Sequence, residues 1–163
     1  YNPTTHDLKL GTGAKVQLSA GTYYFRNLTL DETAKLVITG NVTIYLTGVF
    51  KTATAAQANV DSSPQSKFNA PSEMAIYSSC SDATAASLGY TYCADVDGGS
   101  GFSGAVYVPN GNIRTDHGGN VYGSMIGGSV SNDSGTNFHY DEALANLPGP
   151  GNGVKITGWR QVF

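Results

Sequence analysis

The chain has 163 residues, which is enough for one domain with a continuous core. Only 13% of the residues are charged, while glycine occurs 21 times and tyrosine 10 times, a balance common in secreted and cell-surface β proteins. A net charge of −3 without a basic stripe argues against a nucleic-acid partner, and no apolar run is long enough to predict membrane contact by this fragment.

Short strand-like runs separated by Gly, Asn and Asp turns follow one another through the first fifty residues. They cover residues 8–10, 15–18, 22–25, 27–30, 35–38 and 42–46. This pattern of strand-like runs and turn residues repeats about every 20 residues, a period typical of the stacked turns of a β-solenoid. In this register Val16 lies opposite Leu36, Tyr24 opposite Ile44, and Leu30 opposite Phe50.

The second half of the chain resumes the pattern after two polar stretches. We interpret residues 52–73 and 78–103 as loop inserts that flank one core strand at residues 74–77. Residues 104–107 are then echoed by residues 123–126. Residues 140–147 predict a helical turn, and the alternating residues 154–163 predict a closing strand.

The sequence therefore predicts one all-β domain over residues 1–163. Its architecture is expected to be a short right-handed β-solenoid with two loop inserts, a C-terminal helical turn and a closing strand. Its core is expected to contain Val16, Leu18, Leu28, Leu30, Leu36, Ile38, Ile44, Ile76, Val106 and Met125.

Two cysteines, Cys80 and Cys93, lie in a segment rich in Ser, Ala, Asp and Gly. We interpret them as a disulfide that pins the second insert, a link that contributes about 3 kcal/mol in the chain-entropy model. Free thiols are the alternative, and metal binding is disfavoured because no other His or Cys lies nearby in the sequence. A disulfide implies an oxidising compartment.

Asp95 and Asp97 resemble the opening of a calcium loop, because alternate carboxylates followed by glycine can wrap a hard cation. The downstream acidic residue of an EF-hand is missing, and acidic turns are common. Calcium is the only cofactor that the sequence brings into consideration. Tyr90, Tyr92 and Tyr107 are candidate glycan-binding residues, since aromatic faces stack on sugar rings, although tyrosine is also an ordinary strand residue.

Histidine lies beside carboxylates at residues 139–142 and 116–117. Neighbouring residues point in different directions, so we expect Phe138 and Tyr140 to pack, Asp141 to cap a helix, and Asp116 to lie in a solvated turn. No nucleophile elbow or zinc motif is present, and the basic residues are scattered, whereas polysaccharide-active β-helices need clustered Asp with Lys or Arg. We predict that the chain is not an enzyme.

Three stretches carry a resemblance to a known family. They are Leu18-Ser19-Ala20-Gly21-Thr22-Tyr23-Tyr24-Phe25 with the following Asn27-Leu28-Thr29-Leu30, then Gly135-Thr136-Asn137-Phe138-His139-Tyr140-Asp141-Glu142-Ala143-Leu144, and Gly158-Trp159-Arg160. In these stretches the chain resembles the C-terminal β-helical domain of PilX-type accessory proteins of type IV pilus assembly and of related pilin-like bacterial surface proteins. The resemblance implies display outside the cell behind an N-terminal pilin-like hydrophobic helix.

We therefore expect an extracellular structural or interaction module on the bacterial cell surface, anchored or assembled through an N-terminal segment upstream of Tyr1. Its expected partners are other pilus or surface proteins, further copies of the chain in an oligomer or filament, or a glycan. A stand-alone carbohydrate-binding adhesin is the main alternative function, and a polysaccharide-active β-helix enzyme is the other.

Overall fold

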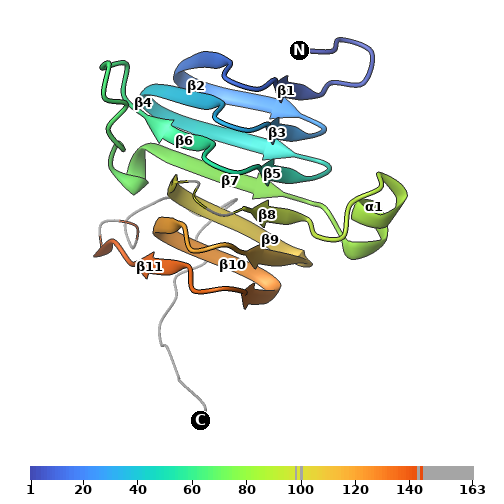
Figure 1. Ribbon diagram of the computed structural model, residues 1–163. Helices are drawn as coiled ribbons and strands as arrows, with labels where there is room; N and C mark the ends of the chain where they lie inside the picture. Colours follow the sequence, from blue (N-terminus) through green and yellow to red (C-terminus); the bar gives the residue numbers. More distant parts are fainter. Residues whose placement is uncertain (98, 100, 143, 145–163) are drawn as a thin grey trace.

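The computed structural model describes residues 1–97, 99, 101–142 and 144, which form a parallel β-solenoid of about six turns (Figure 1). The strands are β1 (Leu8–Leu10), β2 (Lys15–Phe25), β3 (Leu28–Leu30), β4 (Lys35–Leu46), β5 (Phe50–Thr52), β6 (Gln57–Val60), β7 (Met74–Ser78), β8 (Ala94–Val96), β9 (Gly101–Thr115), β10 (Asn120–Asn132) and β11 (Asn137–His139). A 3-10 helix at Pro71–Glu73 precedes β7, and the helix α1 (Asp82–Ser87) precedes β8. The predicted solenoid is confirmed.

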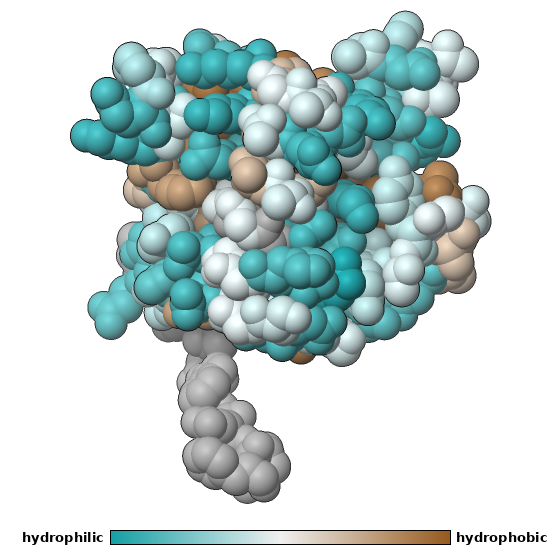
Figure 2. Space-filling model, viewed as in Figure 1, coloured by the Kyte–Doolittle hydropathy of each residue, from teal (hydrophilic) through white to brown (hydrophobic). Residues whose placement is uncertain are grey.

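The strands form three faces along the solenoid. One face contains the first halves of β2 and β4, then β6, the first parts of β9 and β10, and β11. The short-strand face contains β1, β3, β5, β8 and the last parts of β9 and β10. The tyrosine face contains the second halves of β2 and β4, then β7 and the middle parts of β9 and β10. Figure 1 shows β2, β4, β7, β9 and β10 stacked one below another. Because successive side chains alternate, each face has an inward row in the core and an outward row in solvent. Figure 2 shows hydrophilic residues over much of the visible surface, with hydrophobic residues scattered among them.

The predicted register is correct for the second repeat and for the start of the first repeat, and it is wrong further along the first repeat. Val16 lies opposite Leu36, and residues 104–107 lie opposite residues 123–126, as expected. Between Ser19 and Gly21 the register shifts by one residue, so Tyr24 pairs with Tyr45 instead of Ile44. Leu30 then pairs with Thr52, and it is Leu28 that lies opposite Phe50. The offset grows from 21 residues at Tyr24 and Tyr45 to 22 at Leu30 and Thr52, so a second extra residue lies between β4 and β5. Each extra residue at a corner changes the pairings that follow it.

Eight of the ten predicted core residues are buried. The exceptions, Val16 and Met125, are partly buried and pack against the core from strands close to the two ends of the solenoid. Val16 lies on β2, the last strand in the sheet order, so no described turn covers it. The largest fully buried side chains are Phe50 and Phe102, whose ring centroids lie 5.7 Å apart. Neither of them was in the predicted core.

Both inserts are shorter than the predicted ranges 52–73 and 78–103. β6 lies within the first range, while β8 and the start of β9 lie within the second. The centre of β6 is polar, because Asn59 is fully buried with a φ of 66° and its amide donates to the carbonyls of Ala70 and Ser103. Pairing with β4 and β9 on its two sides makes this segment a strand despite its composition.

The predicted closing strand at residues 154–163 lies outside the described residues, as does half of the predicted helical turn at 140–147. In the part of the chain that the structure describes, no helix has the length and apolar character needed to cross a membrane.

An ion pair fastens the first turn of the solenoid to the second. The Asp7 carboxylate accepts hydrogen bonds from Arg26 Nε at 2.9 Å and Arg26 Nη2 at 2.6 Å, and from the Asn27 amide at 2.9 Å. Asn27 is itself buried and accepts a hydrogen bond from the Val49 backbone N–H at 2.9 Å. The Arg26 hydrogen bonds are the main cause that lowers the pKa of Asp7 to about 2. The charged form of Asp7 therefore stabilises the fold.

We expect this contribution to disappear in acid. The folded pKa of Asp7 lies below its unfolded value, so the stabilisation is complete above about pH 4 and is lost as the pH falls towards 2. Asp7→Asn should cost about 1–2 kcal/mol of unfolding free energy at pH 6 and almost nothing at pH 2, measured by urea denaturation. Asp31→Asn, at an exposed pair with Lys9, is the control and should have little effect at either pH. Equal costs for Asp7→Asn at both pH values would contradict the prediction.

Candidate functional site

Residues 79–93 form a loop that the disulfide closes and that we call the stapled loop. Cys80 and Cys93 are both fully buried, and their Cα atoms lie 5.7 Å apart, which confirms the predicted pairing. Within the loop, the Ser81 hydroxyl accepts a hydrogen bond from the Thr84 N–H and so caps α1. The Asp82 carboxylate holds the backbone N–H and the side-chain amide of Asn112 at 2.9 and 2.8 Å. The loop is therefore fixed to β9.

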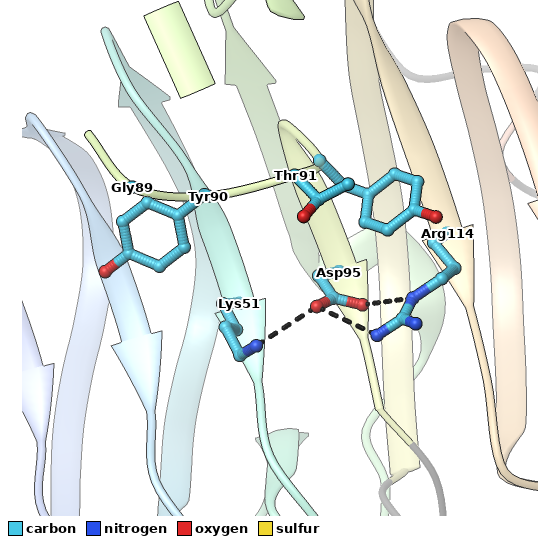
Figure 3. A pocket seen from close by; sticks show the side chains of 7 residues that line it. Lys51, Gly89, Tyr90, Thr91, Asp95 and Arg114 are labelled. Atoms are coloured by element: carbon cyan, nitrogen blue, oxygen red, sulfur yellow. Dashed lines mark hydrogen bonds and ion pairs between the residues drawn. The ribbon is translucent and has the colours of Figure 1, made fainter. Parts of the chain in front are cut away.

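A small polar cavity of about 180 Å³ lies between the stapled loop and the short-strand face (Figure 3). We call it the loop pocket. It is lined by Lys51, Gly89, Tyr90, Thr91, Tyr92, Asp95 and Arg114. Two of the predicted glycan-binding residues, Tyr90 and Tyr92, thus meet one of the predicted calcium ligands, Asp95, in the same cavity.

The parallel register brings the charged residues of the loop pocket together. Lys51, Asp95 and Arg114 occupy equivalent outward positions on the neighbouring strands β5, β8 and β9. Asp95 Oδ2 lies 3.1 Å from Lys51 Nζ, and Asp95 Oδ1 accepts from Arg114 Nε at 2.9 Å. Figure 3 shows the two cationic side chains reaching the carboxylate from its two sides. Because only 10% of the Asp95 side chain is exposed, both cations are needed to compensate its burial.

Arg114 has no freedom to turn towards a ligand. Its Nη2 also donates to Asp95 at 3.2 Å, its Nη1 lies 3.2 Å from Asp116 Oδ2, and its guanidinium sits 4.9 Å from the centre of the Tyr92 ring. The hydrogen bonds to Asp95 and the nearby charge of Asp116 raise the pKa of Arg114. This side chain is a fixed wall of the pocket.

The loop side of the pocket is lined by three residues that carry hydroxyl groups. Among the residues that the structure describes, the side-chain hydroxyls of Tyr90, Thr91 and Tyr92 form no hydrogen bond with the protein. Lys51 uses its ammonium group for Asp95 alone within the same part of the chain. Since an ammonium group carries three donors and each hydroxyl can both donate and accept, the pocket presents several groups ready to bind a polar molecule.

Tyr107 lies on the tyrosine face and is not part of this cavity. There Tyr24, Tyr45 and Tyr77 stack with ring centroids 5.3 and 5.4 Å apart, and Tyr107 meets the Tyr77 ring edge-on at 6.2 Å. Burial raises the pKa of Tyr77. Within this tyrosine row the ring faces cover one another, so a sugar ring finds no free aromatic face at its centre. Tyr107 therefore packs within the tyrosine row, whereas Tyr90 and Tyr92 line the loop pocket.

The geometry does not favour the calcium interpretation of Asp95 and Asp97. Two cationic side chains already hold Asp95, and Asp97 Oδ1 lies 2.9 Å from Nδ1 of His117. Within the described ranges, no group of three or more His, Cys, Asp or Glu side chains is placed to hold a metal ion. A calcium ion at Asp95 would have to displace Lys51 and Arg114.

The two histidine segments also differ from expectation. Asp116 is buried and pairs with Arg114, so it does not lie in a solvated turn, although His117 beside it is exposed. Phe138 and Tyr140 are 43% and 67% exposed instead of packed, because no described turn covers β11. It is the His139 ring that packs, stacked on Tyr122 at a centroid distance of 4.7 Å.

His139 borders a second, wider hollow of about 570 Å³. Aromatic side chains and carboxylates line this hollow, namely Phe68, Tyr122, His139, Tyr140, Asp141 and Glu142, together with Asn69, Pro71 and Ser103. His139 Nε2 lies 3.4 Å from the Asn120 side-chain oxygen. The hollow is a shallow concavity between residues 61–73 and the last described strand, and its contacts assign no acid or base role to His139.

Sequence reasoning did not identify Lys51 and Arg114 as site residues. Their side chains meet Asp95 only through the sheet register, at separations of 44 and 19 residues. The stapled loop interrupts the repeat between β5 and β8, so a constant period does not connect them. The disulfide is the signal that could have connected Lys51 with Asp95. When the loop that it closes is left out of the count, the sequence separation of these two residues becomes closer to the repeat length of the other turns.

Comparison with known proteins yields one match. Residues 2–147 match the family described as Domain of unknown function (DUF7305). This range includes nearly all the residues that the structure describes. No curated protein matches the chain, and no solved structure matches it. Since the family match extends over far more than half of the sequence, the chain belongs to the family Domain of unknown function (DUF7305).

Proposed function

We propose that this chain is an extracellular structural or interaction module, the displayed domain of a pilus-associated or pilin-like bacterial surface protein. The observation that carries the proposal is the stapled loop on a rigid solenoid. Loops inserted between solenoid turns tend to form binding surfaces, and the repeating turns beneath hold such a loop in a fixed position. Here the disulfide, α1 and the Asp82 contacts to Asn112 hold the loop against β9.

The cysteine pair supports an extracellular location for this module. A disulfide persists in oxidising compartments and is rare in the reducing cytosol. Both sulfur-bearing side chains are fully buried, so the bond is part of the packed core. The low content of charged residues, 13%, agrees with the composition of surface β proteins.

Surface display is tested by fractionating the native host. An antibody raised against residues 1–144 should detect the protein in filaments sheared from intact cells, with a cytoplasmic enzyme as the control for lysis. The precursor should then carry a prepilin-type leader and an apolar helix of roughly 20 residues before Tyr1. Protein found in the cytosol and absent from the sheared fraction would overturn the proposal, and a plain cleavable secretion signal directly before Tyr1 would overturn its pilin-like part.

A stand-alone carbohydrate-binding adhesin is the second candidate function. The hydroxyl-bearing residues Tyr90, Thr91 and Tyr92 in the lining of the loop pocket favour it. In this case the protein would be secreted without joining a filament, and the pocket would be its principal site. We propose no catalytic step for either function, since Arg114 and Asp95 hold each other and the histidines pack or pair within the fold.

A further inference from the structure

We propose that the loop pocket binds one uncharged sugar residue at the end of a glycan chain. This inference rests on the proposed role as a surface interaction module and names the ligand class of its stapled loop. The ligand follows from three properties of the cavity: its size, its groups available for hydrogen bonding, and its balance of charge.

The size of the cavity restricts the ligand to a small unit. Its volume is about 180 Å³, the space of about six liquid water molecules. It is smaller than the sites that enclose drug-sized molecules, so it cannot take up several linked rings. The cavity lies on the outward side of the short-strand face, which leaves the remainder of a glycan chain in solvent.

The hydrogen-bonding groups of the wall match a polyol. Tyr90, Thr91 and Tyr92 line the cavity and carry hydroxyls that form no hydrogen bond within the described part of the chain. Lys51 also lines it, and its ammonium group has one partner among the described residues. A sugar hydroxyl can donate to one neighbour and accept from another, which is the pairing that tyrosine and threonine hydroxyls offer. The ammonium group adds donors for a ring or glycosidic oxygen.

The ion pairs of the pocket disfavour an anionic ligand. The lining holds two cations, Lys51 and Arg114, and one carboxylate, Asp95. Asp116, outside the lining, pairs with Arg114 and balances the second cation. The Arg114 nitrogens Nε and Nη2 are bound to Asp95, and Nη1 lies against Asp116. A phosphate or carboxylate would have to compete with these fixed pairs, whereas a neutral sugar does not.

The fixed walls reduce the cost of binding. Arg114 is held by two carboxylates and by the Tyr92 ring, and the loop is held by the disulfide and by the Asp82 contacts to Asn112. Side chains that are already ordered lose little conformational freedom when a ligand arrives. We expect a dissociation constant of about 1 mM for a monosaccharide, which display in many copies would strengthen.

The experiment titrates the folded chain with the methyl glycosides of glucose, galactose, mannose and N-acetylglucosamine, and with methyl glucuronide as the acidic arm. Amide resonances are followed by NMR. At least one neutral glycoside should shift resonances of residues 89–95 and 112–116. Tyr92→Phe and Thr91→Val, which remove one hydroxyl each and keep the shape of the side chain, should weaken binding about tenfold. Tyr107→Phe, the same change on the tyrosine face, should leave the affinity unchanged.

Three outcomes would overturn the inference. They are shifts with none of the neutral glycosides, a preference for the glucuronide, and equal loss of affinity in Tyr92→Phe and Tyr107→Phe. The test is separate from that of surface display. A pocket that binds a sugar in a protein absent from sheared filaments would contradict the display proposal alone, while a displayed protein with an empty pocket would contradict this inference alone.

Discussion

Replacing Gly123 by alanine is expected to cost about 3 kcal/mol or more of unfolding free energy. A Cβ at this position of β10 would overlap the carbonyl oxygen of Gly104 and lie 2.8 Å from its carbonyl carbon. These are backbone atoms of the turn beneath, so no side chain can move aside. The φ of Gly123 is 132°, a conformation that an L-residue rarely adopts. The strand must therefore either leave its register or remain strained.

Gly11→Ala is the matched control for this change. No heavy atom lies within 4 Å of a Cβ built at Gly11, and its backbone does not have a positive φ. We expect its unfolding free energy to remain within about 0.5 kcal/mol of that of the natural chain. Urea denaturation followed by circular dichroism compares the three proteins. Equal midpoints for Gly123→Ala and Gly11→Ala would show that the turns are not packed as closely as the structure indicates.

Gly104 and Gly123 also explain why the repeat of residues 104–107 at residues 123–126 could be recognised in the sequence. Gly104 and Gly123 stand at one corner in successive turns, where the two backbones approach so closely that only hydrogen fits. Inward positions such as Ile44, Ile76 and Val106 likewise form a continuous apolar row, because each turn must bury the same side of the chain. A structural constraint that recurs in every turn selects the same type of residue at the same position of each turn. Such repeats can be recognised from the sequence alone.

Features that occur once could not be predicted in this way. β6 contains a buried Asn59 whose side-chain amide donates to the carbonyls of Ala70 and Ser103, which lie 11 and 44 residues away in the sequence. Its composition alone therefore indicates a loop. The bulge after Ser19 shifts the register by one residue without any strong local signal. The loop pocket was equally unpredictable. It lies between the stapled loop and strands β5, β8 and β9, and the inserts between these strands interrupt the repeat that would otherwise give their register. Tyr90 and Tyr92 could be chosen by residue type, but Lys51 and Arg114 could not.

Removing the disulfide is expected to lower the free energy of unfolding by about 3 kcal/mol. Cys80 and Cys93 are 13 residues apart, and the bond restricts the unfolded chain by closing that ring. The double substitution Cys80→Ala with Cys93→Ala should therefore unfold at a clearly lower urea concentration than the oxidised natural chain. The reduced natural chain should unfold close to the double variant, because it lacks the same restriction.

The double variant also separates the stability of the fold from the geometry of the loop pocket. The ladders that join β5, β8 and β9 do not involve the sulfur atoms, so the solenoid should keep its circular dichroism spectrum. The stapled loop would keep its contacts from Asp82 to Asn112 but would lose its closure at Cys93, next to Tyr92. We therefore expect weaker binding of the neutral glycoside by a folded protein. Unfolding at the same urea concentration as the oxidised natural chain would mean that the ring closed by the disulfide contributes nothing to stability.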